Sequence, residues 1–308
     1  MRKSLRARER ERALVFELEA GCHGCHHRRN GREMSTSNPP SATEIEFIEA
    51  EAWVELHLNL PLDFQSHHRM SVQRRNGAVL LIADRHINKV IGLGLAAPLT
   101  ERDLDDVIAE YSTADVQRFI VQWSPAAVPA VASEWLVERG FTMMPRPMTK
   151  LYRRAGSANV LSTNPPLTVR EIGPDDAQTY EDVVAAPLGV PEGLGPHMRS
   201  TIGQPRWRFY LVYDGHRPIA GAALYVRGRM GWCGLGATIE SDRRRGAQSA
   251  LFARRLSDAA NDGCEWVAAE TLTETADQPN QSYRNMRRLG FVPMYDRPNY
   301  LLDLRNAR

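Results

Sequence analysis

The sequence predicts an α/β (α+β) protein made of two similar bodies, each a mixed, mostly antiparallel sheet flanked by helices. Its 308 residues are enough for roughly two domains of about 150 residues each. Two stretches rich in Pro, Ser and Asn, at 35–42 and 155–166, have the composition of linkers. The predicted organisation is therefore a disordered basic tail over 1–42, a first domain over 43–154, a linker over 155–166 and a second domain over 167–308.

The two predicted domains also end alike. In each, a helical segment runs into a Gly-Phe pair and then an extended strand, at Gly140-Phe141 and Gly290-Phe291. Earlier, each has an apolar strand with Gly-Leu-Gly, at 92–94 and 234–236. These parallels favour an internal duplication. The alternative is two unrelated α/β domains that share helix–Gly–strand joints.

Composition excludes several classes of protein. Hydrophobic residues make up 43% and charged residues 25%, as in globular proteins. No apolar run approaches the ~18 residues of a membrane span. The formal net charge of +2 gives no general attraction to nucleic acid. We therefore expect neither a membrane nor a nucleic-acid partner.

The first 33 residues differ from the rest, with nine Arg or Lys against five Glu. They contain Cys22-His23-Gly24-Cys25-His26, which has the C-x-x-C-H form of a haem attachment site and thiols that could hold zinc. We interpret this as a chance cluster in a tail, predict no metal site, and leave open whether the natural chain starts at Met34. Cys233 and Cys264 stand alone, so a reducing cytoplasm is expected.

The second domain reads as alternating strands and helices. Apolar alternation predicts its strands, Asp214-Gly215 marks a hairpin turn, and Gly173-Pro174-Asp175-Asp176 starts a helix with acidic residues in its first turn. Residues 186–205 are rich in Gly and Pro and irregular. The expected strands are 167–172, 209–214, 218–226, 231–239 and 265–271, followed by a final pair within 291–304, and the expected helices are 174–184, 246–261 and 280–289.

The segment with the clearest chemistry joins strand 231–239 to helix 246–261. It runs Ser241-Asp242-Arg243-Arg244-Arg245-Gly246-Ala247-Gln248-Ser249. A turn of this kind aims backbone N–H groups and a helix dipole at one point, small side chains let an anion approach, and the arginines add attraction. The segment predicts a pyrophosphate cradle, with an ordinary solvated basic helix start as the alternative. The phosphate loop G-x-x-x-x-G-K-[ST] is absent.

Arg243 to Gln248 resemble the acyl-CoA signature R/Q-x-x-G-x-G/A of the GCN5-related N-acetyltransferases, with Gln248 as a departure. Thr238, at the end of the preceding strand, fits one branch of that family. The closing pattern Ser282-x-x-Asn285-x-x-Arg288-x-Gly290-Phe291 is also similar. The resemblance covers about 167–308.

This resemblance implies a site for acetyl-CoA, the acyl donor. The sheet would splay between strands 231–239 and 265–271, the pantetheine arm would lie in the gap, and the pyrophosphate would sit on the cradle. The implied CoA-binding residues are Ala237, Thr238, Ile239, Arg243, Arg244, Arg245, Gly246, Ala247, Gln248, Ser249, Ser282 and Asn285.

Direct transfer to an amine needs oxyanion donors, a base and a group that assists the leaving thiolate. Backbone N–H groups near 237–239 are the candidate donors. Glu270 is the first candidate base and Glu240 the second, although either could be an ordinary surface carboxylate. The family often has a tyrosine acid where this chain has Met286, so Tyr283 and Tyr295 are the candidate acids, or else core or rim aromatics.

The first domain resembles a degenerate copy of the second. At the position of the cradle, residues 96–106 read AAPLTERDLDD, which has a proline, no glycine turn and an acidic helix start. We expect this domain to bind no CoA and to shape the acceptor cleft.

The predicted function is N-acetyl transfer from acetyl-CoA to an amine of a small molecule or peptide, by a monomer or homodimer. One alternative is a non-catalytic acyl-CoA sensor or scaffold. Another is a metal- or haem-carrying redox protein that uses the tail.

Overall fold

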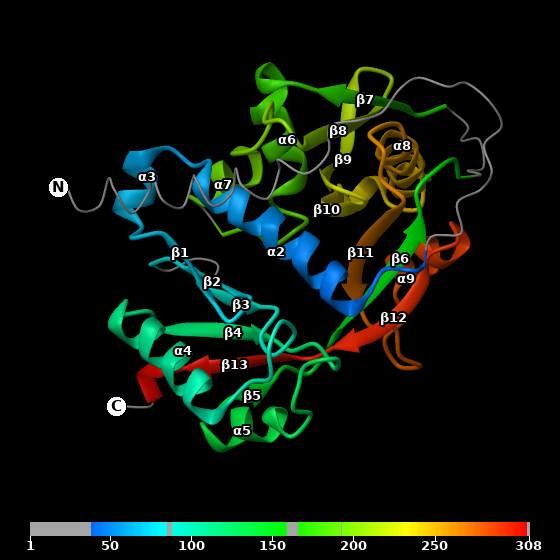
Figure 1. Cartoon of the computed structure of the whole chain (residues 1–308). Coiled ribbons are helices and arrows are strands. Elements are labelled where there is room, and N and C mark those ends of the chain that lie inside the picture. Colours follow the sequence, from blue (N-terminus) through cyan, green and yellow to red (C-terminus); the bar gives the residue numbers. More distant parts are fainter. Residues whose placement is uncertain (1–37, 85–87, 159–165, 192, 307–308) are drawn as a thin grey trace, which may run out of the picture. The chain divides into compact units, whose positions relative to one another are not determined.

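The described chain forms two β-sheets, of six and seven strands (Figure 1). The computed structural model describes residues 38–84, 88–158, 166–191 and 193–306. We call 38–158 the first half and 166–306 the second half. Both sheets are mixed, mostly antiparallel and flanked by helices, as the sequence predicts.

The seven-stranded sheet has the order β12-β6-β11-β10-β9-β8-β7. Only β10 and β11 run parallel, and every other neighbouring pair is antiparallel. The strand bounds are β6 Met148–Arg154, β7 Thr168–Ile172, β8 Trp207–Asp214, β9 Arg217–Arg227, β10 Met230–Thr238, β11 Trp266–Leu272 and β12 Val292–Arg297. The predicted strands of the second half lie within a few residues of these.

Helices cover both faces of this sheet. On one face α8 and α9 bury Leu251, Leu256 and Met286 against the strands. On the other face α6 and α7 bury Tyr180 and Met198. The helical bounds are η1 Pro174–Asp176, α6 Ala177–Val184, α7 Gly195–Arg199, η2 Glu240–Asp242, α8 Ala247–Asn261 and α9 Gln281–Arg288.

The six-stranded sheet has the order β1-β2-β3-β4-β13-β5. Here β3 and β4 form the parallel pair, as β10 and β11 do in the other sheet, which supports the predicted repeat. The strand bounds are β1 Ser71–Arg75, β2 Ala78–Ile82, β3 Lys89–Ile91, β4 Arg118–Gln122, β5 Thr142–Met143 and β13 Asn299–Asp303. The helical bounds are α3 Leu62–His67, α4 Glu101–Thr113, α5 Ala132–Glu138 and η3 Leu304–Asn306.

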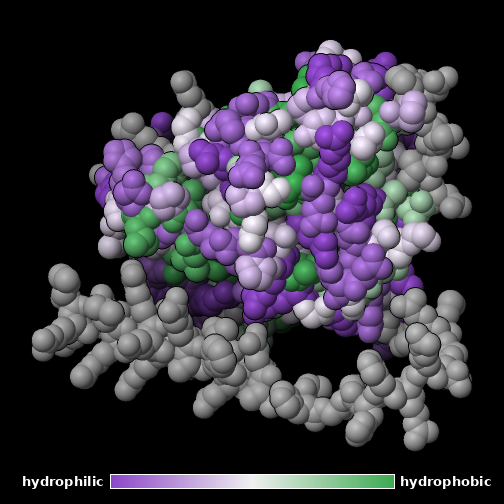
Figure 2. All heavy atoms as spheres, turned by 90° about the horizontal axis from the view of Figure 1, so that it is seen from above, coloured by the Kyte–Doolittle hydropathy of each residue, from purple (hydrophilic) through white to green (hydrophobic). Residues whose placement is uncertain are grey.

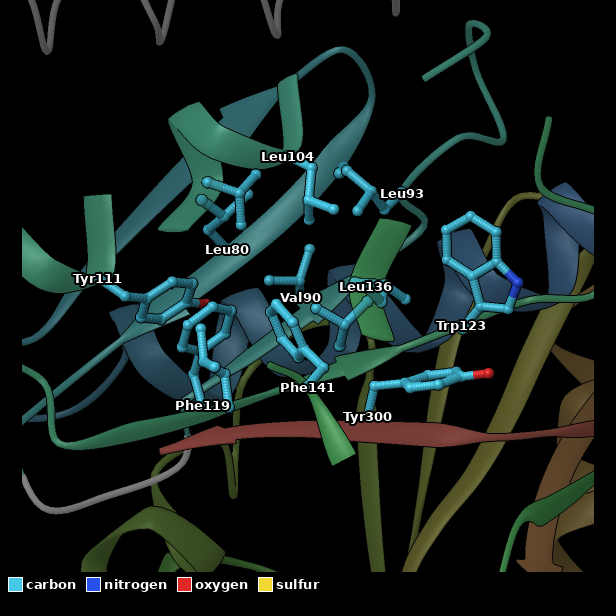
Figure 3. Packing of buried hydrophobic residues seen from close by; sticks show 14 of the residues in the cluster. Leu80, Val90, Leu93, Leu104, Tyr111, Phe119, Trp123, Leu136, Phe141 and Tyr300 are labelled. Atoms are coloured by element: carbon cyan, nitrogen blue, oxygen red, sulfur yellow. The ribbon is translucent and has the colours of Figure 1, made fainter. Parts of the chain in front are cut away.

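The two halves exchange one strand each. β6, from the first half, lies between β11 and β12 of the seven-stranded sheet. β13, from the second half, lies between β4 and β5 of the six-stranded sheet. Its Tyr300 packs in the core of the first half with Phe119 and Phe141 (Figure 3). Each sheet therefore needs a strand from beyond the expected linker at 155–166.

Helix α2, Ala42–Leu58, contacts both sheets (Figure 1). Ile45 and Ile48 pack against the core of the seven-stranded sheet, while Val54 packs against strands β2 and β3. The helix begins with a capping box, because Ser41 Oγ accepts from the Glu44 backbone N–H (3.2 Å) and Glu44 Oε2 accepts from the Ser41 N–H (2.9 Å). Helix α2 and its N-cap Ser41 therefore include residues of the segment that the sequence analysis expects to be tail.

On the face of the molecule shown in Figure 2, hydrophilic and hydrophobic side chains are mixed. No helix in the described ranges is long and apolar enough to cross a membrane. The large apolar side chains gather in four buried clusters inside and between the sheets.

Candidate active site

A cleft of about 1780 Å³ opens between β10 and β11. The two strands pair from Met230–Trp266 to Cys233–Ala269. Beyond that point β10 continues to Thr238 and β11 to Leu272, and no further pairing joins them. The sheet is therefore splayed between the two strands where the family resemblance implies a gap.

One wall of the cleft is a β-bulge in β10. The register against β9 shifts between Gly234 and Ala237, and Leu235 has a φ of 49°. The Tyr180 hydroxyl donates to the Leu235 carbonyl at 2.7 Å and so fixes the bulge. A Cβ on Gly234 would lie 2.0 Å from the buried Trp232 ring, so this position requires glycine. A bulge frees backbone groups from the ladder, and this one faces the cleft.

A second wall is the turn that leads into α8. Gly246, with a φ of 89°, is the N-cap, and Arg244 has a φ of 65°. Residues 242–249 all line the cleft. The start of α8 therefore presents N–H groups and the positive end of its dipole to the same cavity as the bulge.

The three arginines of this turn differ in their contacts with carboxylates. Arg245 donates to Asp242 Oδ1 (2.7 Å) and Asp214 Oδ2 (2.9 Å). Arg217 also donates two hydrogen bonds to the buried Asp242 carboxylate, and these lower the pKa of that carboxyl. Arg245 thus holds the turn in shape. Arg244 has no ion pair among the described residues and is exposed, so its charge is available to a ligand.

Gln248, the departure from the family pattern, joins α8 to α9. Its Nε2 donates to Ser282 Oγ at 2.5 Å, and its Oε1 accepts from Asn285 Nδ2 at 2.6 Å. Arg288 lines the same region and donates to Asn285 Oδ1. Arg288 is absent from the predicted site, although its spacing of three from Asn285 puts both on one helix face.

Glu270 lies where the two strands part, and its side chain is 19% exposed. Its Oε2 accepts from Lys150 Nζ (3.3 Å) and Arg297 Nη2 (2.5 Å). Burial would raise the pKa of this carboxyl, but Arg297, Lys150 and Lys89 together hold it at about 2. Glu270 is therefore ionised at neutral pH, and its Oε1 has no hydrogen-bond partner among the described residues.

Behind Glu270 lies a buried ionic network. Lys150 contacts Glu49, and Arg297 Nη1 donates to Glu46 Oε2 (2.7 Å) and Glu49 Oε2 (3.3 Å). Both glutamates belong to α2 and Lys150 to the exchanged strand β6. The first half thus positions a side chain in the cleft of the second half. No sequence signal identifies these partners, because they lie 27 to 251 residues apart.

Most of the predicted site residues meet in this cleft. The residues that line it are Ala237, Thr238, Arg243, Arg244, Arg245, Gly246, Ala247, Gln248, Ser249, Glu270, Ser282 and Asn285.

The structure places Ile239, Glu240, Tyr283 and Tyr295 outside this lining. The Glu240 side chain is 88% exposed and pairs with Arg243. Tyr283 packs against the core under α8 and α9. Tyr295 donates to Glu46 Oε1 at 2.8 Å, and burial together with Glu46 raises its pKa. These two tyrosines have structural contacts, because β12 lies beyond β6 at the sheet edge and Tyr283 faces the core.

The far end of the cleft is apolar and aromatic. Trp53 of α2 lies 6.3 Å from Trp232 of β10, measured between ring centroids. His197 lies beside them and is bonded to His57 at 3.2 Å, with both imidazoles buried. Lys89 Nζ lies 3.7 Å from the Trp53 ring centroid, and burial lowers its pKa to about 7. Other apolar lining residues here are Met148, Leu188, Val190, Leu194 and Met198.

The equivalent place in the first half is filled. β3 and β4 stay paired over all three residues of β3, and the cavity there is about 20 Å³. Hydrogen bonds join Val128 to Gly94 (2.9 Å) and Leu99 (2.7 Å), so the segment after β4 occupies the space. Helix α4 starts with acidic residues and a Thr100–Asp103 capping box. The two halves therefore differ at this position, where the second half has the open cleft.

The Cys22–His26 motif lies outside the described residues. Within the described ranges, no three His, Cys, Asp or Glu side chains gather as a metal-binding group.

The fold resembles that of the GCN5-related N-acetyltransferases, in a tandem arrangement. A GCN5-related N-acetyltransferase from Kribbella flavida is 15% identical, with a TM-score of 0.55 over 82% of this chain and 93% of its own. One from Sphaerobacter thermophilus is 14% identical, with a TM-score of 0.53 over 74% and 80%. A tandem GNAT protein from the clavulanic acid biosynthesis pathway is 11% identical, with a TM-score of 0.50 over 76% and 83%.

These similarities confirm the predicted fold. No family model and no curated protein matches the sequence.

Proposed function

We propose that this chain transfers an acetyl group from acetyl-CoA to a primary amine, in the cleft of its second half. The observation that carries this proposal is the single cavity that joins the splayed strands, the bulge of β10 and the N-terminus of α8. We infer that the turn before α8, the gap between β10 and β11 and the bulge of β10 take the pyrophosphate, the pantetheine arm and the thioester of CoA, in that order.

The turn before α8 would hold the pyrophosphate through backbone N–H groups and the charge of Arg244. The pantetheine amides would bond to the free edges of β10 and β11. The thioester carbonyl would then accept from backbone N–H groups of the bulge, near Ala237. Donors fixed in this way stabilise the charge that develops on the oxygen during attack.

Glu270 would hold the attacking amine. Glu270 lines the cleft, and because Lys150 and Arg297 hold its Oε2, its Oε1 remains for the amine. Because its pKa is about 2, it is a weak proton acceptor at neutral pH. We therefore assign it the role of orienting the amine and of passing the proton on through water. Glu240, which is exposed outside the cleft, has no such role.

The acceptor end favours an amine with an apolar or aromatic body and one positive charge. Its walls are Trp53, Trp232 and aliphatic side chains. The two carboxylates that line the cleft, Asp242 and Glu270, are both already paired with cations. A polycationic acceptor would meet several arginines and little compensating charge, which disfavours it.

A non-catalytic acyl-CoA sensor is the second candidate. One observation favours it: Met286 stands where the family often has a tyrosine acid, and no tyrosine lines the cleft within the described ranges. The reduced thiols of Cys233 and Cys264 are consistent with the proposed cytoplasmic location for either function.

The test is incubation of the full chain with acetyl-CoA and single amines, followed by thiol release and mass spectrometry of the product. The panel contains arylalkylamines, alkylamines, a polyamine and an N-terminal peptide. The proposal expects turnover that is fastest with an apolar monoamine and lost in Glu270→Gln. CoA binding without turnover on any amine would support the sensor instead.

A further inference from the structure

Arg255 of α8 is a buried cation that lines the cleft. The residue is 2% exposed. Its Nε donates to the Leu251 carbonyl (3.2 Å) and its Nη1 to the Ala223 carbonyl (3.0 Å). Its guanidinium also lies over Phe252, 4.5 Å from the ring centroid. Its Nη2 has no hydrogen-bond partner among the described residues.

The charge of Arg255 is not matched by the protein. Among the residues that the structure describes, no carboxylate lies within 4.0 Å of its guanidinium, whereas other buried or half-buried arginines, such as Arg208, Arg245 and Arg297, have one. A buried charge is costly unless an opposite charge meets it. A guanidinium of this kind, fixed by two backbone carbonyls at a ligand cleft, indicates that the ligand brings negative charge to it.

The position of Arg255 identifies which part of the ligand this is. Its Nη1 bonds Ala223 of β9, which pairs with Gly234, next to Cys233, where β10 and β11 separate. It lies eight residues beyond the start of α8, or about 12 Å at 1.5 Å per residue. The pyrophosphate site is at that start, so Arg255 lies toward the thioester end of the pantetheine arm.

We propose that Arg255 stabilises the thiolate of CoA as it leaves the tetrahedral intermediate. This inference rests on the proposed acetyl transfer. It assigns to a fixed cation the task that a tyrosine acid performs in many relatives and that Met286 cannot perform.

Glu270 and Arg255 lie on opposite faces of the seven-stranded sheet. Glu270 alternates with Ala269 along β11, and Ala269 belongs with Cys233 to the core on the α8 face. Glu270 therefore points to the face of α2, where the acceptor end lies. Arg255 is on the face of α8. The amine would approach from one face and the sulfur would depart toward the other.

The step balances without any further reactant. The nitrogen lone pair forms the C–N bond, the C–S bond breaks, and its electron pair stays on sulfur as the thiolate beside the Arg255 Nη2 group. The proton lost by the nitrogen passes to water on the Glu270 face. The thiolate takes a proton from solvent when CoA departs.

Neighbouring titratable groups do not cancel the charge of Arg255. The groups that respond to it are Tyr180 from α6 and Cys233 from β10. Burial raises the pKa of both, so both are neutral at neutral pH. Asp258, on the same helix, is held by Arg254 (2.8 Å) and the Tyr210 hydroxyl (2.8 Å).

The test needs no acceptor, because free CoA carries the thiol itself. The full chain is saturated with CoA, and the ultraviolet absorption of the thiolate is followed against pH after subtraction of the ligand-free protein. Free CoA, titrated in the same way, gives the reference pKa of its thiol. We expect the bound thiol to titrate roughly one unit lower, which is a tenfold larger ratio of thiolate to thiol at a given pH below its pKa.

Arg255→Met should return the pKa of the bound thiol to that of free CoA or above. Arg255→Lys keeps the charge and should keep part of the shift, and it serves as the test if the methionine variant does not fold. Arg254→Met is the matched control, since Arg254 lies outside the cleft lining, and it should leave the shift unchanged. Bound CoA with an unshifted thiol, or the same shift without the charge at 255, would overturn the inference alone. Absence of CoA binding would overturn the proposed function and this inference with it.

Discussion

Lys150 of β6 and Glu49 of α2 form an ion pair from which solvent is excluded, with side chains 1% and 0% exposed. Both residues belong to the first half, yet Lys150 also reaches Glu270 in the cleft of the second half. The half that has no cradle of its own is therefore part of the candidate active site. This pair links the strand exchange to the chemistry.

Lys150→Met should destabilise the protein by about 3–5 kcal/mol, the usual cost of leaving a buried charge without its partner. The methionine keeps most of the side-chain volume, so the loss reports charge rather than a cavity. Urea unfolding of the full chain measures the free energy of unfolding. Activity should fall as well, because Glu270 loses one of the two groups that orient it.

A double-mutant cycle checks this explanation. Glu49→Gln combined with Lys150→Met removes both charges, so the double variant should lose less stability than the sum of the two single losses. Arg305→Ala breaks an exposed pair with Asp303 and should change the stability little, as exposed ion pairs do. A loss for Lys150→Met no larger than that of Arg305→Ala would contradict the prediction.

Because each half supplies a strand to the other's sheet, we predict that neither half folds alone. A chain of residues 166–308 lacks β6 and leaves β11 and β12 without their common neighbour, while residues 38–158 lack β13 between β4 and β5. We expect each fragment to be aggregated or without a cooperative unfolding transition. Co-expressed as two chains, they should form a 1:1 complex that unfolds cooperatively.

Size-exclusion chromatography and thermal unfolding decide this case. A well-folded second half that binds CoA by itself would show that the exchange is dispensable. Adding β6 at the end of the 166–308 fragment, through a flexible linker, should restore its folding if the missing strand is the cause.

The residues of the proposed CoA cradle can be found from the sequence, whereas the partners of Glu270 cannot, for a physical reason. The cradle and the closing pattern from Ser282 to Phe291 depend on neighbours in the chain, such as the glycine that starts α8. The sequence does not reveal the strand exchange. The exchanged strands β6 and β13 each come after a Gly-Phe pair and an Arg-Pro pair, so the local sequence does not tell which sheet each one joins. Tyr295 likewise depends on Glu46, 249 residues away.

The arginines of the cradle should separate in their effects. Arg244→Ala should weaken CoA binding about tenfold with little change in stability, because Arg244 has no partner in the described part of the chain. Arg245→Ala should weaken binding and also lower the free energy of unfolding measurably, since it breaks charged hydrogen bonds to Asp242 and Asp214. Calorimetric titration with CoA and urea unfolding measure the two quantities.

The salt dependence of CoA binding provides a control for the Arg244→Ala and Arg245→Ala variants. Added salt screens exposed charges, so it should weaken CoA binding to the wild type and reduce the difference between it and Arg244→Ala. Arg243→Ala, which removes a looser pair with the exposed Glu240 (3.5 Å), should have a smaller effect on binding. Equal stability losses at 244 and 245 would show that the turn is not held by Arg245.

The ionisation of Glu270 gives a prediction with a defined pH range. Its pKa in the folded chain is about 2, below the ordinary 4.5, so its ion pairs stabilise the fold fully above about pH 4.5 and lose that contribution as the pH falls toward 2. Glu270→Gln should therefore be clearly less stable than the wild type at neutral pH. The difference should shrink as the pH falls through this range, because protonation removes the same charge. Urea unfolding at several pH values measures it.

The same variant tests the reaction. Because Glu270 remains ionised from about pH 4 upward, the rate should rise with pH along the deprotonation of the acceptor amine, without an inflection from a carboxyl group. Glu270→Gln should lower kcat/KM by about 10²-fold or more, as loss of a positioned acid–base group does. Glu240→Gln is the matched control, since that carboxylate is 88% exposed and outside the cleft, and it should react at the wild-type rate. If Glu240→Gln lowers kcat/KM strongly and Glu270→Gln does not, the assignment is wrong. The attacking amine would then bind near the turn before α8 rather than beside the ionic network of α2 and β6.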